Sequence, residues 1–364
     1  IPAEDRRVLI QRNGNVANDC TDDVHPSVAD LCVLAARTIG LDIAGIDLVT
    51  DDISQPLSRT RGAIVEVNAG PGLLMHLKPA SGEPRAVGEA IAEHLFPAGS
   101  NGRIPLVGVC GVHKSGPVAQ LVAHLLGVAG YKVGVATTGG LTIDRRVLER
   151  GDGTRHDIAS RLLRNRAVEA AVIESPPMMI AGEGMAYDWC QVGIVTDFDP
   201  GLALPDKYLD SPEQIWKVMR TQVDVVLEEG AAVLNAHEPM IVSMAELCIG
   251  SVIFYATDPS LEAVREHCAG GGRAVVLDGQ KIVLIDETSR EVLCDLGSTL
   301  AGGQWRGSVD PSNLLAAVAA AVGLGMPRER LMAGILSFVP ILSPMMPPGQ
   351  TPRQAATDHR SAAA

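Results

Sequence analysis

Aromatic side chains are scarce in this sequence. Phe, Trp and Tyr together make up 3% of the 364 residues, whereas hydrophobic residues as a whole make up 46%. The cores must therefore be aliphatic, and Val, Leu, Ile and Ala suit buried parallel strands covered by helices. The three tryptophans are expected to be packing residues, so the sequence does not indicate a platform on which nucleic-acid bases would stack.

Paired cysteines are also missing. The seven cysteines are odd in number and scattered, and they contain no C-x-x-C pair. This pattern argues against a disulfide framework and against a structural zinc site. It fits a reducing compartment, and we expect a cytoplasmic protein. The nine histidines show no helical metal-ligand spacing, so a histidine metal site is not expected either.

An excess of positive charge and long apolar runs are lacking as well. The formal net charge is -13, which disfavours nucleic acids and anionic membranes as partners because phosphate contacts need clustered Lys and Arg. No apolar run reaches the roughly 18 residues of a spanning helix. The chain opens with IPAEDRRVL, without Met, a signal peptide or a transit signature, so we expect that an N-terminal portion is missing.

Segments typical of strands and helices alternate along most of the chain. Helical patterns cover 27–40, 86–96, 117–130, 215–230 and 311–325. Strand-like runs cover 45–50, 63–69, 104–111, 131–138, 168–175, 191–198, 231–239 and 251–257, and 273–287 reads as a hairpin with Asp278 and Gly279 at its turn. The alternation predicts an α/β fold with a doubly wound, mostly parallel sheet.

A Pro/Gly/Ser/Asn stretch, PAGSNGR, marks the best domain boundary. The predicted domains are 1–98 and 104–340, joined by a linker at 99–103. The segment 341–364 is Pro-rich and then small and polar, and we expect it to be disordered.

Two carboxylates and an amide are predicted to share one face of the first domain. Asp47 lies in one short strand, and Glu66 and Asn68 lie two apart in the next, so the last two side chains point the same way. Converging hard oxygens suit a Mg²⁺ ion that carries nucleotide phosphates. On spacing alone, a solvated face of an edge strand explains the same residues equally well.

The sequence around these residues resembles the cyanophycin synthetases. GLDIAGIDLVTDDISQPL (40–57) followed by GAIVEVNAGPGLLMH (62–76) is similar to the end of the ATP-grasp domain of that family. The resemblance implies that Asp47, Glu66 and Asn68 bind Mg²⁺ and ATP.

Two features of the first domain depart from the family. The segment NGNVANDCTDDVHP (13–26) is too short for the family's Gly-Gly loop, and Leu73-Leu74 replace the family's Arg. Both changes remove groups that would touch phosphates or substrate.

A second candidate site is the turn after the strand 104–111, where GVCGVHKSGP stands in the place of a phosphate loop. Such a loop needs glycines for close backbone approach, a Lys on the phosphates and a Ser or Thr on Mg²⁺. Gly108 and Gly111 have the G-x-x-G spacing, and Lys114 and Ser115 become the Lys-Ser pair if one residue is deleted. The alternative is a turn that packs as a fold element without binding phosphate.

The rest of this region resembles the Mur ligase-like half of the same family. VIESPPMM (172–179) keeps the family's metal-binding Glu as Glu174, and VLNAHEP (233–239) keeps Asn235. The charged residues that follow both positions are replaced, and the family's third, closing domain is not found. The nucleotide-binding and metal positions that the resemblance implies here are Gly108, Gly111, Lys114, Ser115, Asn235 and Glu174.

The implied activity is that of an ATP-dependent ligase that activates a carboxylate as an acyl-phosphate and joins it to an amino group. The implied cofactors are ATP and Mg²⁺. The implied substrates are an amino acid or dipeptide of the aspartate/arginine type and a polymer primer, and a homo-oligomer is expected. Catalysis is expected from the ATP-grasp half, with the Mur-like module largely structural.

Two alternatives stay open at this point. Both modules could be degenerate, which would make the chain a non-catalytic pseudoenzyme, or an oligomerisation or regulatory partner of an active ligase. Alternatively, Lys114, Ser115 and Glu174 could form a working but altered ATP site.

Overall fold

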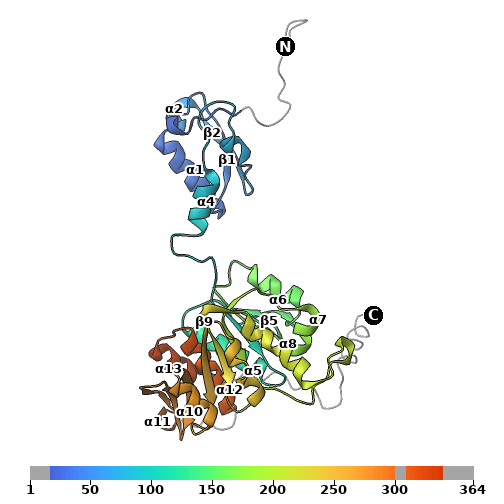
Figure 1. Cartoon of the computed structure of the whole chain (residues 1–364). Coiled ribbons are helices and arrows are strands. Elements are labelled where there is room, and N and C mark those ends of the chain that lie inside the picture. The colour runs from blue at the N-terminus through green and yellow to red at the C-terminus, as the bar shows by residue number, and fades with distance from the viewer. Residues whose placement is uncertain (1–16, 300–308, 339–364) are drawn as a thin grey trace, which may run out of the picture. The chain divides into compact units, whose positions relative to one another are not determined.

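The chain folds into two compact units, which a computed structural model describes over residues 17–299 and 309–338 (Figure 1). One unit ends at Arg103 and the other begins at Ile104. The tail that was predicted to be disordered, 341–364, lies outside the described residues.

The first unit contains a two-stranded antiparallel sheet, in which β1 (Gly45–Val49) pairs with β2 (Ala63–Asn68). Helix α1 (Pro26–Ile39) begins with Pro in its first turn and ends at Gly40, whose φ of 85° is the left-handed conformation that favours glycine at a helix end. The predicted helix and the two predicted neighbouring strands are confirmed. The remaining elements are η1 (Thr21–Asp23), α2 (Leu57–Thr60), α3 (Leu74–Leu77) and α4 (Val87–Leu95).

An eleven-stranded sheet forms the centre of the second unit, in the order β13-β12-β11-β10-β9-β8-β3-β7-β4-β5-β6. The strands from β11 to β4 run parallel to one another. Antiparallel strands extend the sheet at both edges, with β12 and β13 at one edge and β5 and β6 at the other. The predicted α/β fold with a mostly parallel sheet is therefore confirmed.

The strands of this sheet are β3 (Leu106–Cys110), β4 (Val133–Thr137), β5 (Gly140–Ile143), β6 (Arg146–Arg150), β7 (Ala170–Glu174), β8 (Cys190–Val195), β9 (Val226–Asn235), β10 (Ser251–Ala256), β11 (Arg273–Asp278), β12 (Lys281–Ile285) and β13 (Arg290–Asp295). The helical segments are α5 (Ser115–Val128), α6 (His156–Leu163), α7 (Pro177–Glu183), η2 (Pro205–Lys207), α8 (Pro212–Asp224), α9 (Pro239–Val242), η3 (Ala245–Leu247), α10 (Glu262–Ala269), α11 (Leu296–Thr299), α12 (Pro311–Gly323) and α13 (Arg328–Ser337). None of the helices within the described ranges is long and apolar enough to span a bilayer.

Aliphatic cores lie on both faces of the sheet. Along β3, Val107 and Val109 belong to the core that α5, α12 and α13 cover, whereas Leu106 and Cys110 belong to the core that α6, α8 and α10 cover. A strand that is buried on both faces must be apolar at every position. The burial of all five residues of β3 therefore agrees with its place inside the sheet, between β8 and β7.

The winding direction of the chain reverses beside β3. After β3 the chain passes to β4, returns to β7 between them, and then crosses to β8 on the other side of β3. In open α/β sheets, ligands bind in the crevice at the carboxyl ends of the strands where such a reversal occurs. The turn that follows β3 lies at this place.

One local prediction was wrong, and one hairpin was missed. The helix expected over 215–230 ends at Asp224, and Val226 already begins β9, where it pairs with Cys190 of β8. Pairing with a buried neighbour strand overrides the helical pattern there. The β5–β6 hairpin was not predicted, because its turn residues Asp144 and Arg145 adopt positive φ angles of 48° and 64° without a glycine.

Candidate functional sites

The first unit brings together the three oxygen-bearing side chains that the sequence singled out. Asp47 of β1 is paired with Glu66 of β2 across the antiparallel sheet, so both carboxylates lie on one face. Asn68 donates a hydrogen bond from Nδ2 to Asp47 Oδ2 at 3.3 Å. Both carboxylates are exposed.

This group fits a magnesium ion. Mg²⁺ usually keeps several waters and takes only one or two protein carboxylates in addition to substrate phosphates. Within the described ranges, no three His, Cys, Asp or Glu side chains gather as a metal site. The paired carboxylates of Asp47 and Glu66, with the amide of Asn68, could hold such an ion only together with phosphate oxygens and water.

The second unit brings Ser115 and Glu174 together at the carboxyl ends of β3 and β7, which are adjacent strands. Their side chains are nearly fully buried, and the Ser115 hydroxyl donates a hydrogen bond to Glu174 Oε1 at 2.9 Å. Glu174 Oε2 accepts hydrogen bonds from the backbone N–H of Thr138 at 2.7 Å and from its hydroxyl at 3.2 Å. Both carboxylate oxygens therefore accept hydrogen bonds from groups of this chain.

Lys114 is the residue that precedes the first turn of α5. Its Nζ lies 3.4 Å from Oδ2 of Asp310, the residue that caps the N-terminus of α12. The ammonium group that the sequence assigned to nucleotide phosphates is thus paired with a carboxylate.

Asp197 is the residue of this region that sequence reasoning missed. It follows β8, the neighbour of β3, and is buried. Its Oδ2 accepts a hydrogen bond from the backbone N–H of His113 at 2.9 Å, and its Oδ1 accepts one from that of Lys114 at 3.0 Å. Both N–H groups belong to the turn that would be the phosphate loop.

Asn235 supports this arrangement from β9. Its Nδ2 donates a hydrogen bond to the carbonyl oxygen of Thr196 at 2.8 Å, and the Tyr255 hydroxyl donates another to the same oxygen at 3.0 Å. Burial raises the pKa of Tyr255 well above its ordinary value, so its hydroxyl stays protonated and remains a donor. Asn235, which the resemblance assigned to nucleotide, holds the residue before Asp197 in place.

The two glycines of the G-x-x-G spacing are explained by close packing. Gly108 lies within β3, and a Cβ at this position would collide with the Tyr187 hydroxyl and lie 2.5 Å from Gln222 Nε2. A Cβ on Gly111 would collide with the Thr196 hydroxyl and lie 2.6 Å from Asp197 Oδ1. Gly108 faces the core, and only Gly111 belongs to the turn.

A small hollow of about 250 Å³ opens beside the turn, and Ser115, Glu174, Asp152, Thr154 and Met178 are among its lining residues. This volume is below the roughly 300–1,000 Å³ of typical small-molecule pockets.

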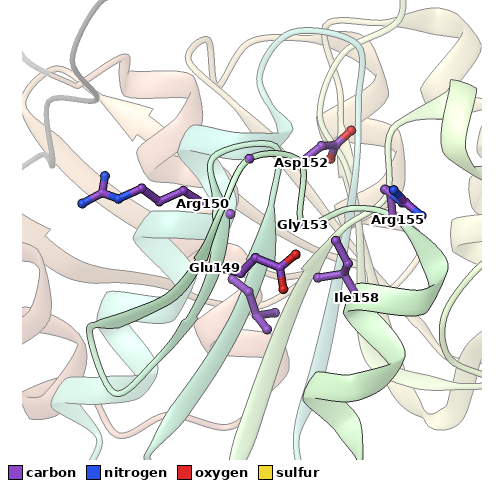
Figure 2. Close-up of a pocket in the computed structure, with 9 residues that line it drawn as sticks. Glu149, Arg150, Asp152, Gly153, Arg155 and Ile158 are labelled. Atoms are coloured by element: carbon purple, nitrogen blue, oxygen red, sulfur yellow. The ribbon is translucent and has the colours of Figure 1, made fainter. Parts of the chain in front are cut away.

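A second hollow of about 260 Å³ lies next to it, between β6 and the start of α6 (Figure 2). In Figure 2, the Arg150 side chain points away from Glu149. Glu149 pairs with Arg161, and Asp152 accepts hydrogen bonds from the N–H and hydroxyl of Thr154 at 2.9 and 2.5 Å. The acidic groups of this hollow are bound by their own neighbours.

Curated proteins similar to this chain carry the name cyanophycin synthetase. The protein from Synechocystis sp. is 37% identical over 328 residues, which cover 89% of this chain and 37% of the relative. The protein from Crocosphaera subtropica is 36% identical over 334 residues, with the same two coverages. The chain thus spans well under half the length of these relatives.

Two solved structures with some similarity carry the names of ligases. The UDP-N-acetylmuramoyl-L-alanyl-D-glutamate–2,6-diaminopimelate ligase matches 69% of this chain and 50% of its own, with 13% identity and a TM-score of 0.48. A pseudomurein peptide ligase type C from Methanothermus fervidus matches 66% of this chain and 50% of its own, with 14% identity and a TM-score of 0.41. No protein family model matches the sequence.

Proposed function

Because this chain is related to the cyanophycin synthetase family along 89% of its length, we propose that it is part of an ATP-dependent ligase that forms an amide bond. The ligase would activate a carboxylate as an acyl-phosphate and then join it to an amino group. Catalysis is assigned to the first unit together with the rest of its domain, and the second unit is assigned a largely structural role.

The observation that carries this proposal is the pairing of Asp47 with Glu66, with Asn68 beside them. When bound there, Mg²⁺ would neutralise the phosphates of ATP, which is the main electrostatic requirement of phosphoryl transfer. The three side chains would hold the ion on the exposed face of the β1–β2 sheet. Their open surroundings leave room for phosphate oxygens and water as the remaining ligands.

The proposed substrates are an amino acid or a dipeptide of the aspartate/arginine type and a polymer primer, following the relatives' name. We further propose that the protein works in the cytoplasm as a homo-oligomer. The scattered cysteines, which form no disulfide within the described residues, are consistent with a reducing compartment.

ADP release tests the ligase proposal. The protein that contains this chain is supplied with ATP, Mg²⁺, a β-aspartyl-arginine dipeptide and a primer. Glu66→Gln should lower the rate by at least about a hundredfold, because a metal ion contributes several kcal/mol of transition-state stabilisation. Glu93→Gln, the same change at an exposed position of α4, is the matched control and should leave the rate unchanged. A wild-type protein that releases no ADP would refute the assignment.

A second candidate function is that of a non-catalytic partner of an active ligase. The contact of Asp197 with the backbone of His113 and Lys114 supports it, because the second unit's own anion-binding turn is filled. This candidate predicts that the protein co-purifies with an active ligase and changes its rate while releasing no ADP alone.

A further inference from the structure

The turn after β3 has the features of an anion site. Two consecutive N–H groups, those of His113 and Lys114, point at one carboxylate, at the N-terminus of a helix of 14 residues. Adjacent N–H groups at a helix N-terminus are the usual binding site for a phosphate. Here the anion is supplied by Asp197 of the same chain.

The carboxylate is held in place before any ligand arrives. The Thr196 hydroxyl donates a hydrogen bond to Asp197 Oδ1 at 2.7 Å. The Thr196 carbonyl is fixed by Asn235 and Tyr255, which come from two further strands. The missing Cβ of Gly111 leaves the space that the Thr196 hydroxyl and the Asp197 carboxylate occupy. Each of these contacts serves to present the carboxylate to the turn.

A nucleotide phosphate would meet two obstacles here. Its oxygens need the N–H groups that Asp197 already occupies, and they would lie next to a buried negative charge, which repels them in a region of low dielectric. The cation that would offset this charge, Lys114, is paired with Asp310 instead.

We propose that the Asp197 carboxylate is a built-in substitute for phosphate, which closes this turn to nucleotides by an autoinhibitory contact. The inference concerns the second unit only and holds whether or not the first unit is catalytic. It predicts that removal of this one carboxylate restores an anion site at His113 and Lys114.

Hydrogen exchange at the backbone of residues 112–116, measured on the whole chain, tests the proposal locally. In Asp197→Ala the N–H groups of His113 and Lys114 should exchange at least about tenfold faster, because each loses a hydrogen bond to a charged group. Inorganic pyrophosphate at millimolar concentration should slow this exchange again in the variant. It should leave the exchange of the wild-type turn unchanged.

The matched control is Asp199→Ala, which removes a negative charge two residues further on, 3.7 Å from the His113 ring, without touching the two N–H groups. It should show wild-type exchange and no response to pyrophosphate. If Asp197→Ala does not fold, the same exchange measurement is made on Asp197→Asn. Its single acceptor oxygen holds only one N–H group, so one of the two N–H groups should exchange faster. Pyrophosphate that slows exchange in the wild type, or exchange that stays the same in the Asp197 variants, would overturn the proposal.

Discussion

The Ser115 hydroxyl donates a hydrogen bond to Glu174 Oε1 at 2.9 Å, and both side chains are at least 95% buried. Ser115→Ala therefore leaves an oxygen of a buried carboxylate without this donor. The free energy of unfolding should fall by about 1–3 kcal/mol. Denaturant unfolding measures the loss. Ser160→Ala, whose hydroxyl bonds to the backbone of its own helix at His156, should change stability by less than about 0.5 kcal/mol. Equal effects of the two changes would contradict this account of Glu174.

Gly108→Ala tests the finding that the first glycine of the G-x-x-G spacing serves packing. The new methyl group on β3 would collide with the Tyr187 hydroxyl and approach Gln222 of α8, and such overpacking costs about 1–3 kcal/mol. Gly127→Ala, in the following helix α5 and with no atom near the added Cβ, should stabilise α5 by up to about 1 kcal/mol. Thermal melts of both variants and the wild type measure these changes in stability. A Gly108→Ala variant as stable as the wild type would show that the core has room there.

We expect the burial of His267 to make the protein less stable as the pH is lowered. Burial lowers its pKa below the ordinary value of 6.5, so between the two values the unfolded chain binds more protons than the folded one. Stability then falls as the pH drops through about 6.5. His267→Gln can still donate to the carbonyl of Val252, which the ring nitrogen contacts at 3.1 Å, but it does not titrate. The drop in melting temperature between about pH 7.5 and about pH 5.5 should be smaller in this variant, and an unchanged drop would exclude His267 as its source.

Asp47→Asn should weaken the binding of Mn²⁺, used as a spectroscopic probe for Mg²⁺, when ATP is present. The loss should be at least about tenfold, since it removes one of two paired carboxylates. Electron paramagnetic resonance of the free ion gives the affinity without relying on turnover. Asp51→Asn, an exposed acid just beyond β1, is the matched control. Equal affinities in both variants would place the metal elsewhere.

The parallel part of the sheet could be predicted because strands buried on both faces are apolar at nearly every position. All five residues of β3 are buried, and so are all five of β7. The edge hairpin formed by β5 and β6 could not, because β6 is largely exposed and carries Arg146, Glu149 and Arg150. A strand of that kind lacks the apolar run by which the others were found.

The candidate sites divide in the same way. Asp47, Glu66 and Asn68 could be placed together from the alternation of side chains along two strands that are neighbours in sequence. Asp197 could not, because its role depends on β8 lying beside β3, a non-local pairing of Val195 with Cys110. The available signal was the polar pair Thr196-Asp197 directly after an apolar strand, since polar residues at that end of a parallel strand face the ligand crevice.

Asp197 also determines how the occupancy of the turn after β3 depends on the concentration of nucleotide. A tethered ligand acts at an effective concentration of about millimolar on a loose linker, and far higher when it is held in a fixed orientation. The hydrogen bonds from Asn235 and Tyr255 to the Thr196 carbonyl oxygen restrict the motion of the backbone that carries Asp197. A diffusing polyphosphate must compete with the Asp197 carboxylate, whose local concentration does not change because it belongs to the same chain. The occupancy of the turn is therefore set by the fold and does not follow the supply of nucleotide.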